Sequence, residues 1–205
     1  MAVGDFNGDG VQELFIGAPG YSLKGKGQLG AVYRTTFFTN ATAELVDSTD
    51  PFLVPEEAYS RFGYALAVID INHDGIDDLV VSAPSWGQGG PTDIGDYYPK
   101  AYNGRLYVYL GKKDVGILKG SAPSFVIRSR SEDDVFFNMG LSLKVSDCNG
   151  DGKPDLIILS PLSQQGGDKR GHIAIVYNAM SKIDNQMQAL YIEDSDFILT
   201  GSQNY

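Results

Sequence analysis

The sequence predicts an all-β chain that forms about three blades of a β-propeller, and three observations carry this prediction. A ten-residue segment with the pattern Asp-x-Asn-x-Asp-Gly-x-x-(Asp/Glu)-Leu occurs three times, starting at residues 5, 70 and 147. Strand-like apolar segments flank these copies, and no part of the sequence shows convincing helical periodicity. The repeat offers four strand-like segments, which is the number in one propeller blade.

The first strand of each repeat leads into the acidic loop. It covers residues 65–69 and 141–145 in the second and third repeats, and residues 1–4 are the tail of the same strand in the first. A Phe-Gly pair at 62–63 stands eight residues before the second loop. Met139-Gly140, a soft apolar substitute, holds the same place before the third loop.

Three further strands follow each loop. The second is an apolar run that ends at a proline, which suits a strand buried on both faces because proline cannot continue the hydrogen-bonded ladder. These runs are 14–19, 79–84 and 156–161. A third strand is entered by glycine, at 30–33, 104–109 and 171–177. A more polar outer strand comes last, at 51–54, 124–127 and 196–199.

The repeats divide the chain into blade units of approximately 1–50, 51–123 and 124–195, with 196–205 beginning the next unit. The first unit lacks its Phe-Gly strand, and the third ends where another Phe-Gly strand is expected. Because a closed propeller needs roughly 4–8 blades, three units leave open sheet edges. We therefore expect an internal fragment of a longer chain or an incomplete gene model.

The composition excludes several kinds of partner and structure. The 205 residues, 42% of them hydrophobic, suffice for one sizeable domain or for part of a larger one. The formal net charge of −10 makes nucleic acid and anionic lipid poor partners. The single cysteine, Cys148, excludes an intramolecular disulfide. No apolar run reaches about 18 residues, so no membrane span is predicted, and no signal peptide is visible.

Oxygen-bearing residues alternate in the loops in a way that suits Ca²⁺, which takes roughly six to eight oxygen ligands. Positions 1, 3 and 5 are Asp, Asn and Asp, and position 9 is acidic. Position 7 varies, as expected if only its backbone carbonyl is used, and the invariant glycine at position 6 suits a turn with positive φ. One Ca²⁺ per loop, three in all, is predicted. The candidate ligands are Asp5, Asn7, Asp9, Val11, Glu13, Asp70, Asn72, Asp74, Ile76, Asp78, Asp147, Asn149, Asp151, Lys153 and Asp155.

Other interpretations of the loops have less support than a calcium site. The EF-hand places its closing acid at position 12 between helices, Mg²⁺ demands a stricter octahedron, and Zn²⁺ favours thiolate and imidazole. Clusters of Asp, Asn and Gly are also ordinary turn sequences, but three copies in register with matching flanks disfavour that alternative. Metal-free carboxylates repel one another, so the metal is assigned a structural role in pinning the hairpin.

The order of Phe-Gly, acidic loop and Gly-Ala-Pro resembles the FG-GAP repeat. This resemblance implies blades of a larger, seven-bladed propeller, as in integrin α chains and in the C-terminal part of glycosylphosphatidylinositol-specific phospholipase D. The runs 60–66, 74–84 and 103–112, and the insertion between Pro84 and Gly104, look more like the phospholipase D family. Met139-Gly140 and the Leu-Ser-Pro at 159–161 depart from the pattern.

The resemblance implies a calcium-binding, non-catalytic segment of a secreted enzyme that hydrolyses the inositol phosphate linkage of GPI anchors. Catalytic residues and zinc would belong to a separate N-terminal domain, which this sequence lacks. Its partners would be that domain, the remaining blades and GPI-anchored substrates. An integrin α-like adhesion propeller that binds extracellular protein ligands is the alternative, and a free-standing repeat protein that binds glycans or other partners is a third.

Four residues outside the ligand set could suggest other chemistry. His73 and His172 lie 99 residues apart in different repeats, so neither is expected to be catalytic or to bind zinc. Cys148 holds position 2 of its loop, as the apolar Phe6 and Ile71 do in theirs, which predicts a packing position. Asn40 begins an Asn-Ala-Thr glycosylation acceptor, which supports an extracellular location.

Overall fold

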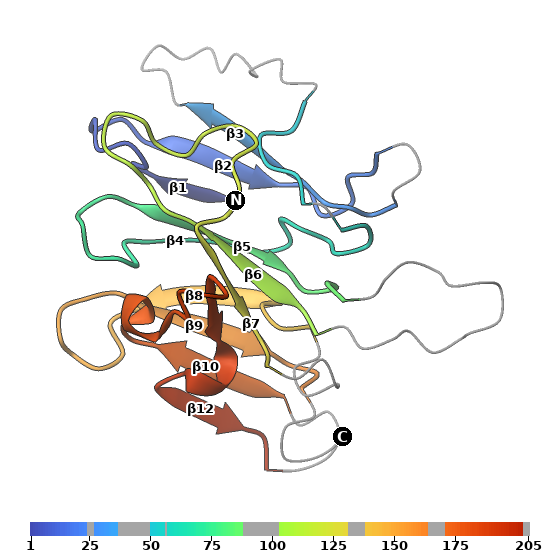
Figure 1. Cartoon of the computed structure of the whole chain (residues 1–205), viewed down its shortest axis with the longest axis vertical. Coiled ribbons are helices and arrows are strands. Elements are labelled where there is room, and N and C mark those ends of the chain that lie inside the picture. The colour runs from blue at the N-terminus through green and yellow to red at the C-terminus, as the bar shows by residue number, and fades with distance from the viewer. Residues whose placement is uncertain are drawn as a thin grey trace, which may run out of the picture.

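The computed structural model describes residues 1–23, 27–36, 50–55, 57–87, 103–130, 138–163 and 171–202. Within these ranges the chain forms twelve strands and two short 3₁₀ helices, η1 (Ala179–Lys182) and η2 (Ile192–Asp194), which confirms the all-β prediction. The strands make three sheets, and Figure 1 shows these stacked on one another along the long axis of the molecule. Among the described residues, no helix is both long and apolar enough to cross a membrane.

The first sheet contains three antiparallel strands in chain order. They are β1 (Ala2–Gly4), β2 (Glu13–Gly17) and β3 (Val32–Thr36). The predicted outer strand is reduced to one bridge, in which Leu53 pairs with Val32. The outer edge of this sheet is therefore only briefly covered by the segment at 51–54.

The other two sheets are larger. The second contains β4 (Leu66–Ile69), β5 (Asp78–Ala83), β6 (Arg105–Tyr109) and β7 (Phe125–Arg128), with β11 (Ala189–Tyr191) added parallel to β7. The third contains β8 (Ser142–Ser146), β9 (Asp155–Ser160), β10 (His172–Val176) and β12 (Phe197–Thr200). Apart from the β7–β11 pair, neighbouring strands in both sheets run antiparallel.

Each predicted outer strand pairs with the sheet that precedes it in the chain. Leu53 joins the first sheet, β7 lies beside β6, and β12 lies beside β10. A unit boundary at 51, 124 or 196 therefore falls before the last strand of a sheet rather than between two sheets. The sequence did not predict β11. This strand belongs to the third repeat but pairs with β7 at the edge of the second sheet.

The middle strand β5 lies between two hydrophobic cores. All six of its residues are buried, as the apolar run predicts. Val80 packs into one core with the third sheet, and Leu79 and Val81 pack into the other with the first sheet. The same prediction is wrong for β2, where Ile16 is 41% exposed, because only one face of that sheet is covered by another described sheet.

Small residues allow the first and second sheets to approach closely. Gly63 of the Phe-Gly pair lies against Gly17, and a Cβ atom built on Gly17 would collide with the Gly63 carbonyl oxygen. A Cβ on Gly63 would lie 2.5 Å from the carbonyl oxygen of Ala31. The Gly63 φ of +85° also favours glycine. The Phe-Gly pair of one blade therefore docks on the end of the second strand of the blade before it.

Met139 takes the place of Phe62 at the next interface. Both side chains are fully buried. The backbone of each residue lies against the glycine that opens the third strand of the preceding sheet, Gly30 for Phe62 and Gly104 for Met139. The departure from Phe-Gly in the third repeat therefore preserves the packing, as expected for a flexible apolar side chain of similar volume.

Candidate metal centres

The three acidic loops connect the first strand of each sheet to the second. They join β1 to β2, β4 to β5 and β8 to β9, and in Figure 1 they project from the same side of the molecule. The first strands contact one another, with β4 lying against both β1 and β8. The stacking of the sheets thus places three chemically equivalent loops in a row.

The carboxylate at position 1 organises each loop by accepting backbone N–H groups. One oxygen accepts from the position-6 glycine, at 2.8, 2.9 and 2.9 Å in the three loops. The other accepts from the position-5 N–H, at 3.2, 3.0 and 3.2 Å. Burial would raise the pKa of Asp5, but the hydrogen bonds from Gly10, Gly8 and Asp9 outweigh it and lower that pKa.

Positions 3 and 5 continue the same network. The amide oxygen at position 3 accepts the position-5 N–H at 3.0, 3.0 and 2.9 Å. The position-5 carboxylate accepts the position-7 N–H at 2.7, 2.9 and 2.9 Å, and its second oxygen accepts from the position-3 amide group. The bonds from Lys153 and Asn149 lower the pKa of Asp151. All three loops are therefore built from one hydrogen-bond pattern.

Backbone conformation explains two positions of the motif. The position-6 glycines have φ values of 83°, 86° and 81°, so the predicted left-handed turn is confirmed. Position 4 is also left-handed, and there His73, at φ 60°, stands where the other two loops have glycine. His73 thus belongs to the framework of its loop.

The acids at position 9 are buried, unlike the acids at positions 1 and 5. Glu13 is 4% exposed, and Asp78 and Asp155 are fully buried. Each accepts the position-2 N–H of its own loop, at 3.1, 2.9 and 2.7 Å. Burial raises the pKa of Asp78 to about 7, although hydrogen bonds from Gly111 and Ile71 oppose the shift. Oδ1 of Asp155 is buried without a hydrogen-bond partner among the described atoms.

Loop 1 is also held by the second blade. Lys112 and Asp114, which follow β6, donate backbone N–H bonds to the carbonyl oxygens of Phe6 and Asn7, at 3.1 and 2.8 Å. Asp77 at position 8 of loop 2 accepts the Asp5 N–H. Sequence reasoning missed Asp77, because position 8 varies between the loops (Gln12, Asp77 and Pro154) and gives no repeated signal.

The oxygen atoms of the loops are suitable ligands for a hard cation, with one restriction. In the described part of the chain, no group of three or more Asp, Glu, His or Cys side chains lies close enough together to hold a metal ion. A cation would therefore also need the position-3 amide oxygen and backbone carbonyls, which are oxygen donors of the kind Ca²⁺ takes. The partnerless Oδ1 of Asp155 is a further free oxygen donor. Coordination by the carbonyls of Val11, Ile76 and Lys153 stays a prediction.

Comparison with known families agrees with this repeated architecture. The model of the FG-GAP repeat matches residues 1–33 and 62–109. The chain contains FG-GAP repeats. The matched residues include β1, β2, β4, β5 and β6 of the first two sheets, and the third sheet repeats their antiparallel strand order. The sheets are therefore blades of a β-propeller, as the sequence predicts.

The relatives are much longer proteins, and this chain matches a part of each. Phosphatidylinositol-glycan-specific phospholipase D is 35% identical over 209 residues in both rat and human, covering 100% of this chain and 23% of each relative. Integrin alpha-8 of chicken is 28% identical over 195 residues, covering 88% of this chain and 15% of the relative. The chain therefore spans 23% of the length of the phospholipase D relatives.

The structure corrects one prediction about the FG-GAP loops. Cys148 is exposed, so it is not a packing position, whereas Phe6 is 1% and Ile71 3% exposed. Segments of the second and third sheets cover Phe6 and Ile71, while no described segment covers position 2 of the third loop. The predicted glycosylation acceptor Asn40 lies outside the described residues.

Proposed function

We propose that this chain is the calcium-binding, non-catalytic propeller segment of a secreted phospholipase D that hydrolyses the inositol phosphate linkage of GPI anchors. The observation that carries the metal proposal is the threefold repetition of one oxygen-rich loop with a single hydrogen-bond pattern. The parent enzyme is proposed from the 35% identity to the phospholipase D of rat across this whole chain.

Calcium is given a structural role in this proposal. Each loop closes the hairpin between the first two strands of a blade, so an ion bound there would hold the innermost strands in register. Three Ca²⁺ ions would change the formal net charge from −10 to −4 and relieve repulsion among carboxylates. A site filled at ten times its dissociation constant adds about 1.4 kcal/mol to the free energy of unfolding.

Catalysis is assigned to another part of the parent protein. In this proposal a separate N-terminal zinc-dependent domain carries the hydrolytic residues, and the FG-GAP blades support or position it. The partners are that domain, the remaining blades and GPI-anchored substrates, and the setting is extracellular. A calcium requirement suits this setting, because extracellular calcium modules bind at about 10⁻⁴–10⁻³ M.

An integrin α-like adhesion propeller is the second candidate, and the 28% identity to chicken integrin alpha-8 favours it. The complete reading frame separates the two. A histidine-rich hydrolase domain encoded upstream supports the phospholipase D, and a membrane-spanning helix encoded downstream supports the integrin-like receptor.

Isothermal titration of the 205-residue chain with Ca²⁺ tests the metal proposal, with three sites expected. Changing the position-5 acid, as Asp9→Asn, Asp74→Asn or Asp151→Asn, keeps the oxygen that accepts the position-7 N–H but removes a charged ligand. Each variant should lose one site or weaken it at least tenfold. Substitution of Asp78 is a poorer test, because its carboxylate also satisfies the buried N–H groups of Ile71 and Gly111.

The matched control is Asp184→Asn. Asp184 accepts two backbone N–H bonds, from Gln186 and Met187, in a turn without the repeated ligand pattern. Its substitution should leave calcium binding unchanged. A titration that shows no calcium-dependent heat, or the same number of sites in all three position-5 variants as in the unmodified chain, refutes the metal proposal.

A further inference from the structure

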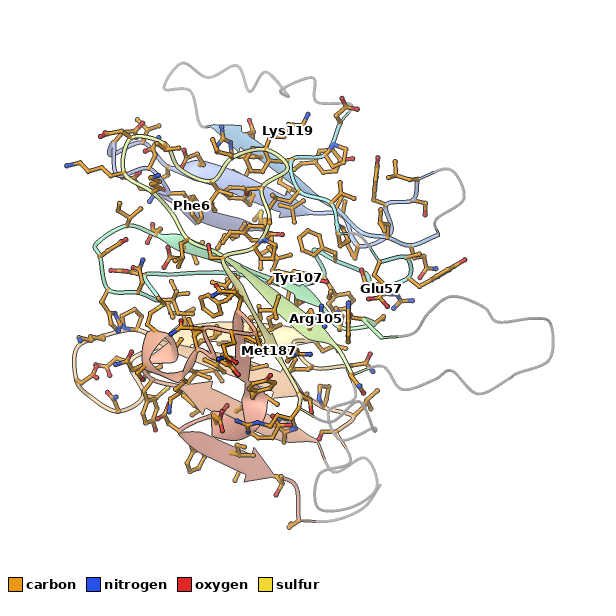
Figure 2. The ribbon with its side chains drawn as sticks, in the orientation of Figure 1. Phe6, Glu57, Arg105, Tyr107, Lys119 and Met187 are labelled. Atoms are coloured by element: carbon orange, nitrogen blue, oxygen red, sulfur yellow. The ribbon has the colours of Figure 1, made fainter. Side chains whose placement is uncertain are left out.

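A pocket of about 600 Å³ opens against the second sheet. One wall comes from the segment after the Leu53 bridge and includes Pro55 and Glu57. The other comes from the second sheet and includes Trp86, Arg105 and Tyr107. Figure 2 shows Glu57, Arg105 and Tyr107 close to one another. The volume lies within the range of about 300–1,000 Å³ typical of small-molecule sites.

Strand alternation in β6 places these groups toward the first blade. Leu106 and Val108 are fully buried in the core shared with the third sheet. The residues that alternate with them, Arg105 and Tyr107, therefore face the opposite way and line the pocket. A polar and aromatic surface is thus held on a rigid strand.

Arg105 is preorganised at this surface. Its guanidinium carbon lies 3.4 Å from the centroid of the Trp86 ring, a cation–π contact, and its side chain bonds that of Tyr107. The Arg105 Nε atom is buried and has no hydrogen-bond partner among the described atoms. Burial also lowers the pKa of this side chain. Because Arg105 lines the pocket and its guanidinium carries several N–H donors, it can donate hydrogen bonds to a ligand oxygen placed there.

Glu57 supplies the complementary group on the facing wall. It accepts the Gly87 N–H at 3.3 Å through one oxygen, and a carboxylate has further acceptor sites for hydroxyl donors. Glu57 also lies close enough to Arg105 to interact with its charge. The two charges offset each other, and the chain as a whole carries −10, so neither an anion nor a cation is strongly favoured.

A ligand that fits this pocket needs both acceptors and donors, no net charge, and a flat apolar surface to lie on the aromatic rings. A pyranose ring has these properties, because its hydroxyl groups ring the edge and its C–H bonds cover the faces. We propose that the pocket binds a neutral carbohydrate, with hydroxyl groups bonded to Arg105 and Glu57 and the ring against Trp86 and Tyr107. This ligand site goes beyond the structural role proposed for the blades and does not depend on it.

Trp86 is the only tryptophan of the chain, so its fluorescence reports directly on the pocket. The 205-residue chain, kept in excess Ca²⁺, is titrated with methyl glycosides of the common neutral hexoses, with the matching uronates and with inorganic phosphate. Saturation-transfer NMR on the same probes gives a readout independent of Trp86. We expect millimolar binding of at least one neutral glycoside, with a saturable change in Trp86 emission.

Two variants and one control locate the binding. Arg105→Lys, which keeps the charge, and Glu57→Gln, which keeps the shape, should each weaken the affinity about tenfold, as expected for one lost hydrogen bond to a charged group. Arg34→Lys is the control, because Arg34 also stacks on an aromatic ring, Phe52 at 4.6 Å, outside the pocket lining. The Arg34→Lys variant should bind the glycoside with the same affinity as the unmodified chain.

Tighter binding of disaccharides than of monosaccharides supports the proposal, and the other remaining outcomes overturn it. Binding of the uronates or phosphate without the neutral glycosides makes this an anion site. No binding of any probe, or binding by both Arg105→Lys and Glu57→Gln as tight as that of the unmodified chain, removes the carbohydrate assignment. Disaccharides that bind more tightly than monosaccharides would identify the end of a glycan chain, rather than a free sugar, as the ligand source.

Discussion

Asp77 of the second blade accepts a hydrogen bond from the backbone N–H of Asp5 in the first blade, at 2.8 Å. The Asp77 N–H in turn donates to the Asp5 carbonyl oxygen at 3.2 Å. This reciprocal pair ties position 1 of the first acidic loop to position 8 of the second. The geometry of the first loop therefore depends on contact between blades as well as on its own sequence.

Asp77→Ala should lower the free energy of unfolding by about 1 kcal/mol, because the partly buried Asp5 N–H loses its acceptor. Calcium binding at the first loop should also weaken. Asp77→Asn, which retains an acceptor oxygen, should cost less. Chemical denaturation measures the effect, with Asp50→Ala as the control at an exposed carboxylate. Equal stability of the Asp77→Ala and Asp50→Ala variants would contradict this role.

Removing divalent cations should destabilise the whole stack of blades. If three sites each add about 1.4 kcal/mol at ten times the dissociation constant, EDTA should lower the melting temperature by several degrees and added Ca²⁺ should restore it. Mg²⁺ should restore less, because it demands a stricter octahedral geometry. Differential scanning calorimetry in EDTA, Ca²⁺ and Mg²⁺ makes the comparison, and identical melting curves in all three would count against bound calcium.

Gly63→Ala should destabilise the chain by more than about 2 kcal/mol. The new methyl group would meet the Ala31 carbonyl 2.5 Å away, and the φ of +85° would add strain of about 1–2 kcal/mol. Gly120→Ala is the control that measures backbone strain without a steric clash, because the φ of Gly120 is +71° but nothing lies within 4 Å of the added atom. Denaturation midpoints of the two variants should differ clearly. Similar midpoints would mean that the Phe-Gly contact between blades is unimportant.

His172 should make stability fall in mild acid. It is 3% exposed, its cross-strand neighbours Ser160 and Thr200 are uncharged, and burial lowers its pKa from 6.5 to about 4. The unfolded chain therefore binds a proton between about pH 6.5 and 4 that the folded chain does not. Stability from this residue is complete above pH 6.5 and is lost on acidification, by up to about 1.4 kcal/mol per pH unit.

The variant His172→Leu should flatten this part of the pH profile. His73→Asn is the matched control, because asparagine tolerates the left-handed backbone at position 73. Urea denaturation at half-unit steps from pH 7 to pH 4 measures both. A His172→Leu profile as steep as that of the unmodified chain would assign the acid sensitivity to carboxylates instead.

The features that the sequence predicts correctly are local or periodic. The turns of the acidic loops are made by hydrogen bonds between residues at most seven positions apart, so the motif predicts these turns, and the second blade adds further bonds to the first loop. The positions of most strands along the chain follow from runs of apolar residues between turn signals. The burial of β5 on both faces is predicted for the same reason. Metal ligation itself stays a prediction from the donor pattern.

Other features depend on contacts between segments far apart in the chain, and only the tertiary structure decided them. Asp77 and Asp5 are 72 residues apart, and the bond between them exists only because two blades stack. Cys148 shares its motif position with the buried Phe6, yet its exposure depends on which segment covers it. The pocket of Arg105 and Glu57 likewise forms only where the segment after the Leu53 bridge meets the second sheet. A repeated local sequence determines the blade, whereas burial and binding surfaces depend on the neighbour that each blade meets.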